Sequence, residues 1–216
     1  MRAPSERRTI APMTLPARPR RHATAADLLA IPEAERFHEI IDGDLVPKAT
    51  PSWSHGRAQA RMTARVSDPY DRPPGRRGPG GWWFVTEVEI ALEPNQIYRP
   101  DIAGWRRERL AAPPTELPVR ARPDWVCEVL SPSNASNDTV KKLRTYHRSQ
   151  VPHTWILDPL HETLTILRWT EGGYLLVAAG GRGDRVRGEP FEAIELDVSE
   201  LFGDEDEAGE PEKDDT

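Results

Sequence analysis

Two carboxylates in neighbouring predicted strands are the residues of this chain best placed to do chemistry together. Asp101 follows Pro100 at the entrance of one strand, and Glu128 lies in the middle of the next, the most apolar strand of the chain. Because side chains alternate along a strand, Glu128 faces away from Cys127. A buried carboxylate is costly unless a cation, a basic side chain or a proton compensates it. Two such groups side by side repel each other, and a hard divalent cation such as Mg²⁺ relieves the repulsion.

Each carboxylate also has an ordinary structural interpretation. Glu128 could form an internal ion pair with one of the many arginines, and Asp101 could serve as a turn or cap residue. The metal interpretation requires more, since both groups must be buried and converge on one face of a sheet.

The elements that must position these residues are those of a mixed α/β domain. We expect helices at residues 24–31, 55–66 and 137–150. Single strands are expected at 82–92, from 99, at 124–130 and at 151–159, and hairpins at 36–49 and 164–179. The connecting segments are a turn at 93–98 and loops at 68–81 and 106–123. Asp42-Gly43 is the strongest hairpin signal and puts Glu39 on a strand. The strand, helix and strand of 124–159 predict a parallel crossover. The expected fold is α/β (α+β), a mixed central sheet flanked by helices.

The helix after the Glu128 strand is predicted from its cap and its apolar spacing. Asn137 or Asp138 is a suitable N-cap. Val140, Leu143 and either Tyr146 or His147 are then expected on the buried face.

Composition places few limits on the partner. The net charge of −6 divides into +5 for residues 1–22, −7 for 203–216 and −4 for the rest, so it neither supports nor excludes DNA. Residues 1–21 are expected to be a disordered basic arm, 22–202 one domain and 203–216 a disordered acidic tail. A single cysteine excludes an internal disulfide. No apolar run approaches the ~20 residues that span a bilayer, and no signal peptide is recognisable, so we expect a cytoplasmic protein with no membrane partner.

The order of these motifs resembles the bacterial Uma-type family of restriction endonucleases, a branch of the PD-(D/E)xK superfamily. The likeness runs from about residue 22 to Phe202, and its most specific part is EVLSPSN followed by Asp138, Lys142, Tyr146 and Val151. The resemblance implies a restriction-endonuclease-like core and a Mg²⁺- or Mn²⁺-dependent endonuclease that hydrolyses phosphodiester bonds of nucleic acid, with DNA expected. Asp101 and Glu128 match the metal-binding acids of the family.

One position departs from the superfamily pattern. Leu130 stands where the usual lysine falls, and leucine can neither lower the pKa of a water nor offset negative charge. Lys142 matches a lysine of the Uma-type pattern and is the candidate substitute, although most helix lysines are simply solvated. Lys141 beside it is the natural control.

Three further residues match family positions. Glu39 is a candidate metal ligand or base, or else an edge-strand charge. His55 is a candidate for phosphate contact or ligand orientation, or else a cap or surface residue. Asp138 is a supporting candidate.

Arginines in the two proline-rich loops are the expected phosphate contacts, since the chain has no helix-turn-helix, zinc finger or RNP pattern. They are Arg72, Arg76, Arg77, Arg106, Arg107, Arg109, Arg120 and Arg122.

Two other functions remain open from the sequence. One is a catalytically impaired nuclease fold that binds DNA or a protein partner, as Leu130 suggests. The other is an interaction protein in which Glu128 is merely ion-paired. Metal binding separates both from a nuclease. The sequence also leaves a homodimer open.

Overall fold

A six-stranded mixed sheet forms the centre of the molecule and carries both carboxylates of interest. The computed structural model describes residues 21–75, 78–132 and 136–203. The strand order is β10-β9-β8-β7-β6-β3, and only β7 and β8 run parallel. The bounds are β3 Trp82–Thr86, β6 Ile102–Arg106, β7 Trp125–Val129, β8 His153–Asp158, β9 Thr163–Thr170 and β10 Gly173–Gly181.

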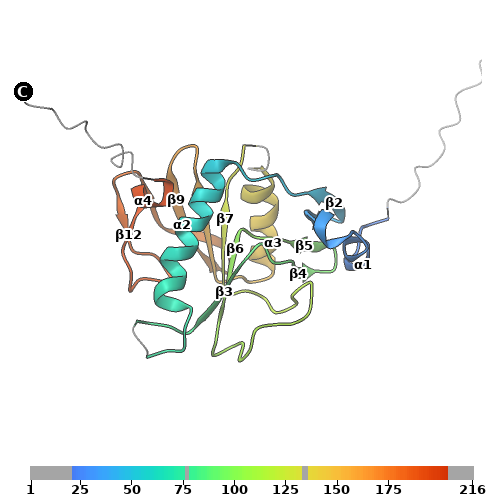
Figure 1. Cartoon of the computed structure of the whole chain (residues 1–216), viewed down its shortest axis with the longest axis horizontal. Coiled ribbons are helices and arrows are strands. Elements are labelled where there is room, and N and C mark those ends of the chain that lie inside the picture. Colours follow the sequence, from blue (N-terminus) through green and yellow to red (C-terminus); the bar gives the residue numbers. More distant parts are fainter. Residues whose placement is uncertain (1–20, 76–77, 133–135, 204–216) are drawn as a thin grey trace, which may run out of the picture.

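A four-stranded antiparallel sheet lies at one end of the molecule, beside α1 (Ala25–Leu29), as Figure 1 shows. Its order is β2-β1-β5-β4, with β1 His38–Ile41, β2 Asp44–Pro47, β4 Ile90–Glu93 and β5 Gln96–Tyr98. The helices are α2 Trp53–Tyr70, α3 Leu143–Arg148 and α4 Val198–Phe202, and a 3-10 turn spans Glu33–Glu35. A π-helical segment, Asn137–Lys142, continues directly into α3. The short strands β11 Arg185–Val186 and β12 Leu196–Asp197 pair with each other.

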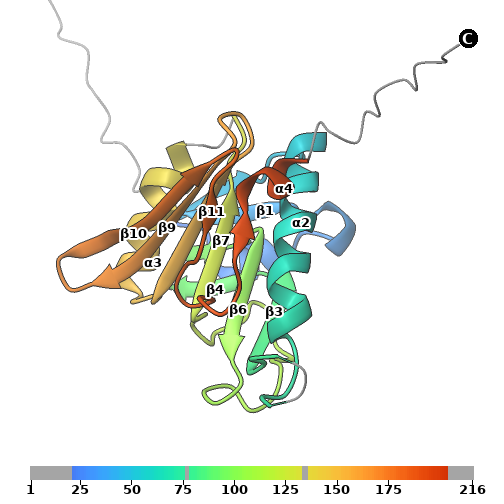
Figure 2. The same ribbon diagram turned by 90° about the vertical axis from the view of Figure 1, so that its left-hand side faces the viewer.

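The two faces of the large sheet are covered by different elements. Trp125, Cys127 and Val129 of β7 pack in the cluster that contains the apolar face of α2, whereas Val126 packs in a second cluster with Tyr146 of α3. Figure 2 shows α2 and α3 on opposite sides of the sheet. The predicted alternation along β7 is therefore confirmed, and Glu128 lies on the α3 side.

Most predicted elements are confirmed, including the mixed sheet flanked by helices, the β1–β2 hairpin at Asp42-Gly43, the parallel crossover from β7 to β8 and the β9–β10 hairpin. Thr24 caps α1 as expected, since its side chain accepts a hydrogen bond from the Asp27 backbone N–H.

The stretch 82–92 is not one strand, and this prediction was wrong. The chain divides it into β3 and β4, which belong to different sheets. Glu87 lies between them with a φ of 56°, a left-handed conformation that breaks the pleat although the apolar alternation continues through it. Helix α2 also extends further than predicted, through Pro69 to Tyr70, so residues 68–70 are helical and not part of a loop.

The helix after β7 begins before its predicted caps. Asn137 and Asp138 lie within the π-helical segment, and Ser136 precedes it without a side-chain cap. Val140 is exposed, contrary to the prediction, and Tyr146 is buried as predicted. Lys142 and Thr145 are buried as well. A π-helical turn holds one more residue than an α-turn, which rotates the buried face away from the predicted spacing.

Several expectations fall on residues outside the described part of the chain. These are the arm 1–20, the tail 204–216, Arg76 and Arg77. Among the described residues, no helix combines the length and apolar character needed to cross a bilayer.

Candidate functional site

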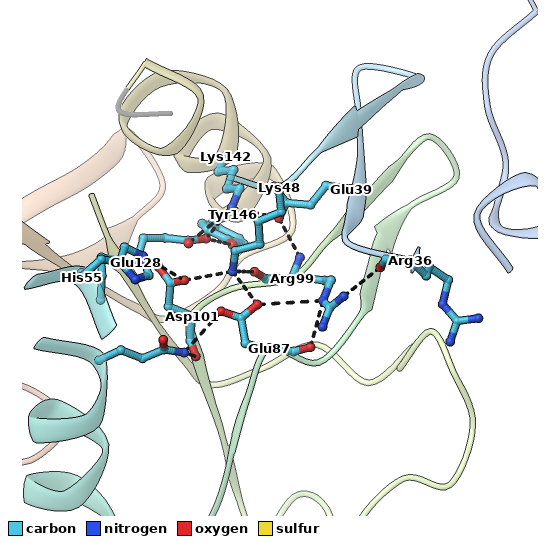
Figure 3. Close-up of polar contacts among 12 residues, drawn as sticks. Arg36, Glu39, Lys48, His55, Glu87, Arg99, Asp101, Glu128, Lys142 and Tyr146 are labelled. Atoms are coloured by element: carbon cyan, nitrogen blue, oxygen red, sulfur yellow. Dashed lines mark hydrogen bonds and ion pairs between the residues drawn. The ribbon is translucent and has the colours of Figure 1, made fainter. Parts of the chain in front are cut away.

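Asp101 and Glu128 converge at the carboxyl end of β7. The antiparallel register pairs Ile102 with Cys127, which places Asp101 beside the end of β7, and Asp101 Oδ2 accepts a hydrogen bond of 2.6 Å from the Val129 backbone N–H. Both carboxylates are at most 2% exposed. They line one cavity of about 10 Å³, roughly the room that one water molecule needs. The predicted burial of the two side chains and their approach to one cavity are thus present. Figure 3 shows both within the same group of polar side chains.

Glu128 is held by the helical segment on its own side of the sheet. Lys142 Nζ lies 3.3 Å from its carboxylate oxygens, and the Tyr146 hydroxyl donates a hydrogen bond to Oε1. Burial and the neighbouring Glu128 charge raise the pKa of Tyr146 well above its usual value, so the phenol stays protonated as a donor. Among the ion pairs that the described residues form, Glu128 is paired with Lys142, whereas the ion-pair interpretation favoured an arginine.

Lys142 is not a solvated helix lysine. It is 1% exposed, and its ammonium group lies 2.9 Å from Glu39 Oε1 as well as near Glu128, whereas Lys141 is exposed. Glu39 also accepts a hydrogen bond of 2.7 Å from the Arg99 backbone N–H. Because β1 is an inner strand of its sheet, Glu39 is not an edge-strand charge. Glu39, Glu128 and Lys142, predicted separately, belong to one cluster.

Lys48, which the sequence interpretation missed, is the second lysine of this cluster. Its ammonium group donates to Asp101 Oδ1 at 2.9 Å, Glu87 Oε2 at 2.7 Å and the Arg99 carbonyl at 2.7 Å. Burial lowers the pKa of Lys48, but the charges of Asp101 and Glu87 outweigh this and leave it raised. The hairpin register could have revealed this lysine, since position 48 continues the strand on the face of Val46, which pairs with Glu39.

His55 lies in the first turn of α2 and reaches Asp101. Its backbone N–H donates to the cap residue Ser52, while ring Nε2 lies 3.4 Å from Asp101 Oδ1. The ring is buried, contrary to a surface role. Burial raises the pKa of Asp101, yet the hydrogen bond from His55 and the charge of Lys48 outweigh it and hold that pKa well below its usual range. Asp101 is therefore ionised at neutral pH.

The donor atoms at this site fit a hard divalent cation in kind. Among the described residues no three His, Cys, Asp or Glu side chains are arranged as a metal site. Mg²⁺, however, is commonly bound by only one or two protein carboxylates plus water and substrate phosphate. Asp101 and Glu128 can supply those oxygens, and the buried Nδ1 of His55 has no hydrogen-bond partner within the described ranges. An ion at Asp101 Oδ1 would compete with Lys48 for that atom.

The arginine loops are not brought to this cluster. Asp101 precedes β6 and Arg106 ends it, so Arg106 and Arg107 lie at the opposite end of the strand. Their guanidinium carbons stand 4.7 Å and 3.2 Å from the ring centroids of Trp82 and Trp83. Backbone hydrogen bonds through Gly81 hold Arg72 beside Arg107 at the same end.

The other arginines predicted from these loops have structural contacts or lie apart from the cluster. Arg109 pairs with Asp124, Arg122 donates to the Gln150 carbonyl, and Arg120 is exposed. Leu130, the position of the missing lysine, donates its backbone N–H to the Leu157 carbonyl. The side chain of Asp138 lies outside the described part of the structure.

Comparison with known proteins agrees with this fold. The Uma2 family, described as "Putative restriction endonuclease", matches residues 25–199. A crystal structure described as "a putative nuclease belonging to DUF820" from Anabaena variabilis superposes with a TM-score of 0.65 at 20% sequence identity, covering 83% of this chain and 97% of that one. No curated protein matches. The family match spans most of the chain, which therefore belongs to the Uma2 family and shares the fold of that Anabaena variabilis protein.

Proposed function

We propose that this protein is a Mg²⁺- or Mn²⁺-dependent endonuclease that hydrolyses phosphodiester bonds of nucleic acid, with DNA as the expected substrate. One observation carries the proposal: Asp101 and Glu128 are buried, line the same cavity and lie at the carboxyl end of β7. Membership of the Uma2 family adds the reaction class.

A metal ion held by Asp101 and Glu128 would supply the acidified water and the positive charge that phosphodiester hydrolysis needs. Asp101 is kept ionised and fixed by the Val129 N–H, Lys48 and His55. Glu128 is oriented by the hydroxyl of Tyr146 and the ammonium group of Lys142. Both acids thus have defined orientations before any ligand arrives, which reduces the reorganisation that binding requires.

Lys142 takes the role of the lysine that Leu130 cannot fill. Its ammonium group reaches the carboxylate of Glu128 from a helix on the same face of the sheet. An ammonium at that place offsets negative charge regardless of which element supplies it. The loss of lysine at position 130 therefore does not remove the positive charge from the site.

A catalytically impaired binding module is the second candidate, and a specific observation favours it. Each lysine already bridges two of the acids, Lys48 between Glu87 and Asp101 and Lys142 between Glu39 and Glu128. These acids therefore have basic partners without a metal ion.

Calorimetric titration with Mn²⁺, followed by a cleavage assay, distinguishes the two functions. We expect the wild type to bind Mn²⁺, and Asp101→Asn and Glu128→Gln to lose most of that binding. Glu171→Gln, an exposed turn position, is the matched control and should bind Mn²⁺ like the wild type. Binding that is absent from the wild type, or unchanged in both site variants, contradicts the proposal.

A further inference from the structure

One face of α2 carries an exposed tryptophan, a half-buried arginine and an exposed arginine. Trp53, Arg57 and Arg61 are spaced four residues apart, so their side chains follow each other along the helix. Trp53 is 85% exposed. Together with Pro51, Ser52 and Gly56 they line an open groove of about 720 Å³.

This groove adjoins the carboxylate cluster. Pro51 lines both the groove and the cavity that contains Asp101 and Glu128. His55, between Trp53 and Arg57 in sequence, turns to the other side of the helix and reaches Asp101. A ligand lying along this face of α2 therefore arrives at the mouth of the proposed catalytic cavity.

The two arginines differ from those in the loops at the far end of the sheet. Within the described parts of the chain, neither Arg57 nor Arg61 forms an ion pair, whereas Arg65, the next arginine in the row, is paired with Glu200. Arg57 and Arg61 are about 6 Å apart along the helix axis. Two guanidinium groups in a row beside an exposed indole combine phosphate binding with a flat surface for stacking.

We propose that this face of α2 binds a single-stranded nucleic-acid segment, with a base stacked on Trp53 and phosphates at Arg57 and Arg61, and directs it to the cavity of Asp101 and Glu128. The inference rests on the proposed nuclease function, which makes nucleic acid the ligand. It moves the phosphate contacts from the arginine loops to the element that carries His55.

The acidic segment 204–216 is the competing occupant. It follows Gly203, whose backbone lies against the guanidinium group of Arg57, and eight of its residues are acidic. It contains no aromatic residue, however, so it offers nothing to stack on Trp53. The pairing of an exposed indole with the arginines favours the nucleic acid.

Fluorescence anisotropy of labelled oligonucleotides in EDTA tests the proposal with the full chain. The probes are a single strand of about 16 nucleotides, the upper end of the usual site size, and a duplex of equal length. We expect tighter binding of the single strand. Trp53→Ala should weaken it at least about fivefold at fixed salt, with Trp53→Phe keeping most of the affinity. Arg57→Gln and Arg61→Gln should each reduce the slope of log K against log salt by about 0.7.

Arg185→Gln, at an exposed arginine of β11 outside this groove, is the matched control and should change neither affinity nor slope. None of the four substituted side chains belongs to the core, so melting temperatures should stay near that of the wild type. Three results would each overturn the assignment. They are wild-type affinity in the α2 variants, a preference for the duplex, and binding of a peptide of residues 203–216 without binding of any oligonucleotide. Because EDTA removes catalysis from the assay, failure of this inference is separate from failure of the nuclease proposal.

Discussion

The ammonium group of Lys48 lies 2.9 Å from Oδ1 of Asp101, the carboxylate oxygen that does not receive the Val129 N–H. A metal ion bound by Asp101, as proposed, would therefore compete with Lys48 for the same atom. Lys48→Met should destabilise the metal-free protein by about 3 kcal/mol, because Asp101 and Glu87 keep their charges without this counter-ion. Mn²⁺ should then raise the melting temperature of the variant more than that of the wild type.

Thermal unfolding with and without Mn²⁺ measures both effects. Lys141→Met, an exposed neighbour of the other buried lysine, is the control and should behave like the wild type. Equal Mn²⁺-induced shifts in Lys48→Met and the wild type would show that Lys48 does not oppose metal binding.

Lys142→Gln should reduce any measured cleavage by at least about tenfold, since losing one electrostatic contact to the transition state costs more than ~1.4 kcal/mol. The same change should also lower stability, because it leaves the buried Glu39 and Glu128 without their shared ammonium. Assays must therefore run well below the melting temperature of the variant.

Lys141→Gln provides the comparison for that experiment. Its exposed side chain should leave cleavage and stability unchanged. Equal activity of the folded Lys142→Gln and Lys141→Gln proteins contradicts the role assigned to Lys142.

Because of His153, the free energy of unfolding should fall in mild acid. Burial, together with the charges of Arg106 and Arg168, lowers the pKa of His153 from 6.5 to about 4. The unfolded chain binds this proton at a higher pH than the folded chain, so the stability present above pH 6.5 is lost as the pH falls toward 4. Between pH 7.5 and 5 the loss should be about 1–2 kcal/mol.

Urea unfolding at the two pH values tests this, with His153→Gln as the variant. The variant should lose less stability than the wild type over the same interval. His161→Gln, at an exposed position, should retain the wild-type pH dependence. Identical losses in wild type and His153→Gln contradict the prediction.

A shortened chain of residues 21–203 should remain folded, because the arm and tail it lacks have no apolar periodicity to join a core. Its melting temperature, followed by circular dichroism, should lie within a few degrees of that of the full chain. A larger fall would show that one of the removed segments stabilises the domain.

Local signals predicted the elements that carry the acids. The turn at Asp42-Gly43 determined the β1–β2 hairpin and the strand position of Glu39, and alternation along β7 determined which face Glu128 occupies. Those features depend on neighbouring residues alone. The convergence of Asp101 with Glu128 followed from placing both on adjacent strands of one sheet.

The rest depended on long-range structure. The division of 82–92 between two sheets requires the left-handed backbone at Glu87, which no local pattern signalled. The burial of Lys142 depends on a π-helical segment, whose geometry differs from the expected α-helical spacing. The hairpin register indicates the face that Lys48 occupies. It does not indicate that Lys48 meets Asp101, because alternation along a strand says nothing about how separate sheets approach each other.

A cleavage assay tests the central claim most directly. Its substrates are labelled DNA and RNA, each as a single strand and as a duplex. The wild type and Asp101→Asn are compared with Mg²⁺ or Mn²⁺ and with EDTA. The account predicts that the wild type cuts at least one of these substrates only when metal is present. Asp101→Asn should lower the rate at least about a hundredfold, since the metal contributes several kcal/mol of charge stabilisation. Glu171→Gln should keep the full rate. Cleavage that persists in EDTA or in Asp101→Asn, or a wild type that binds metal yet cuts no substrate, would contradict it.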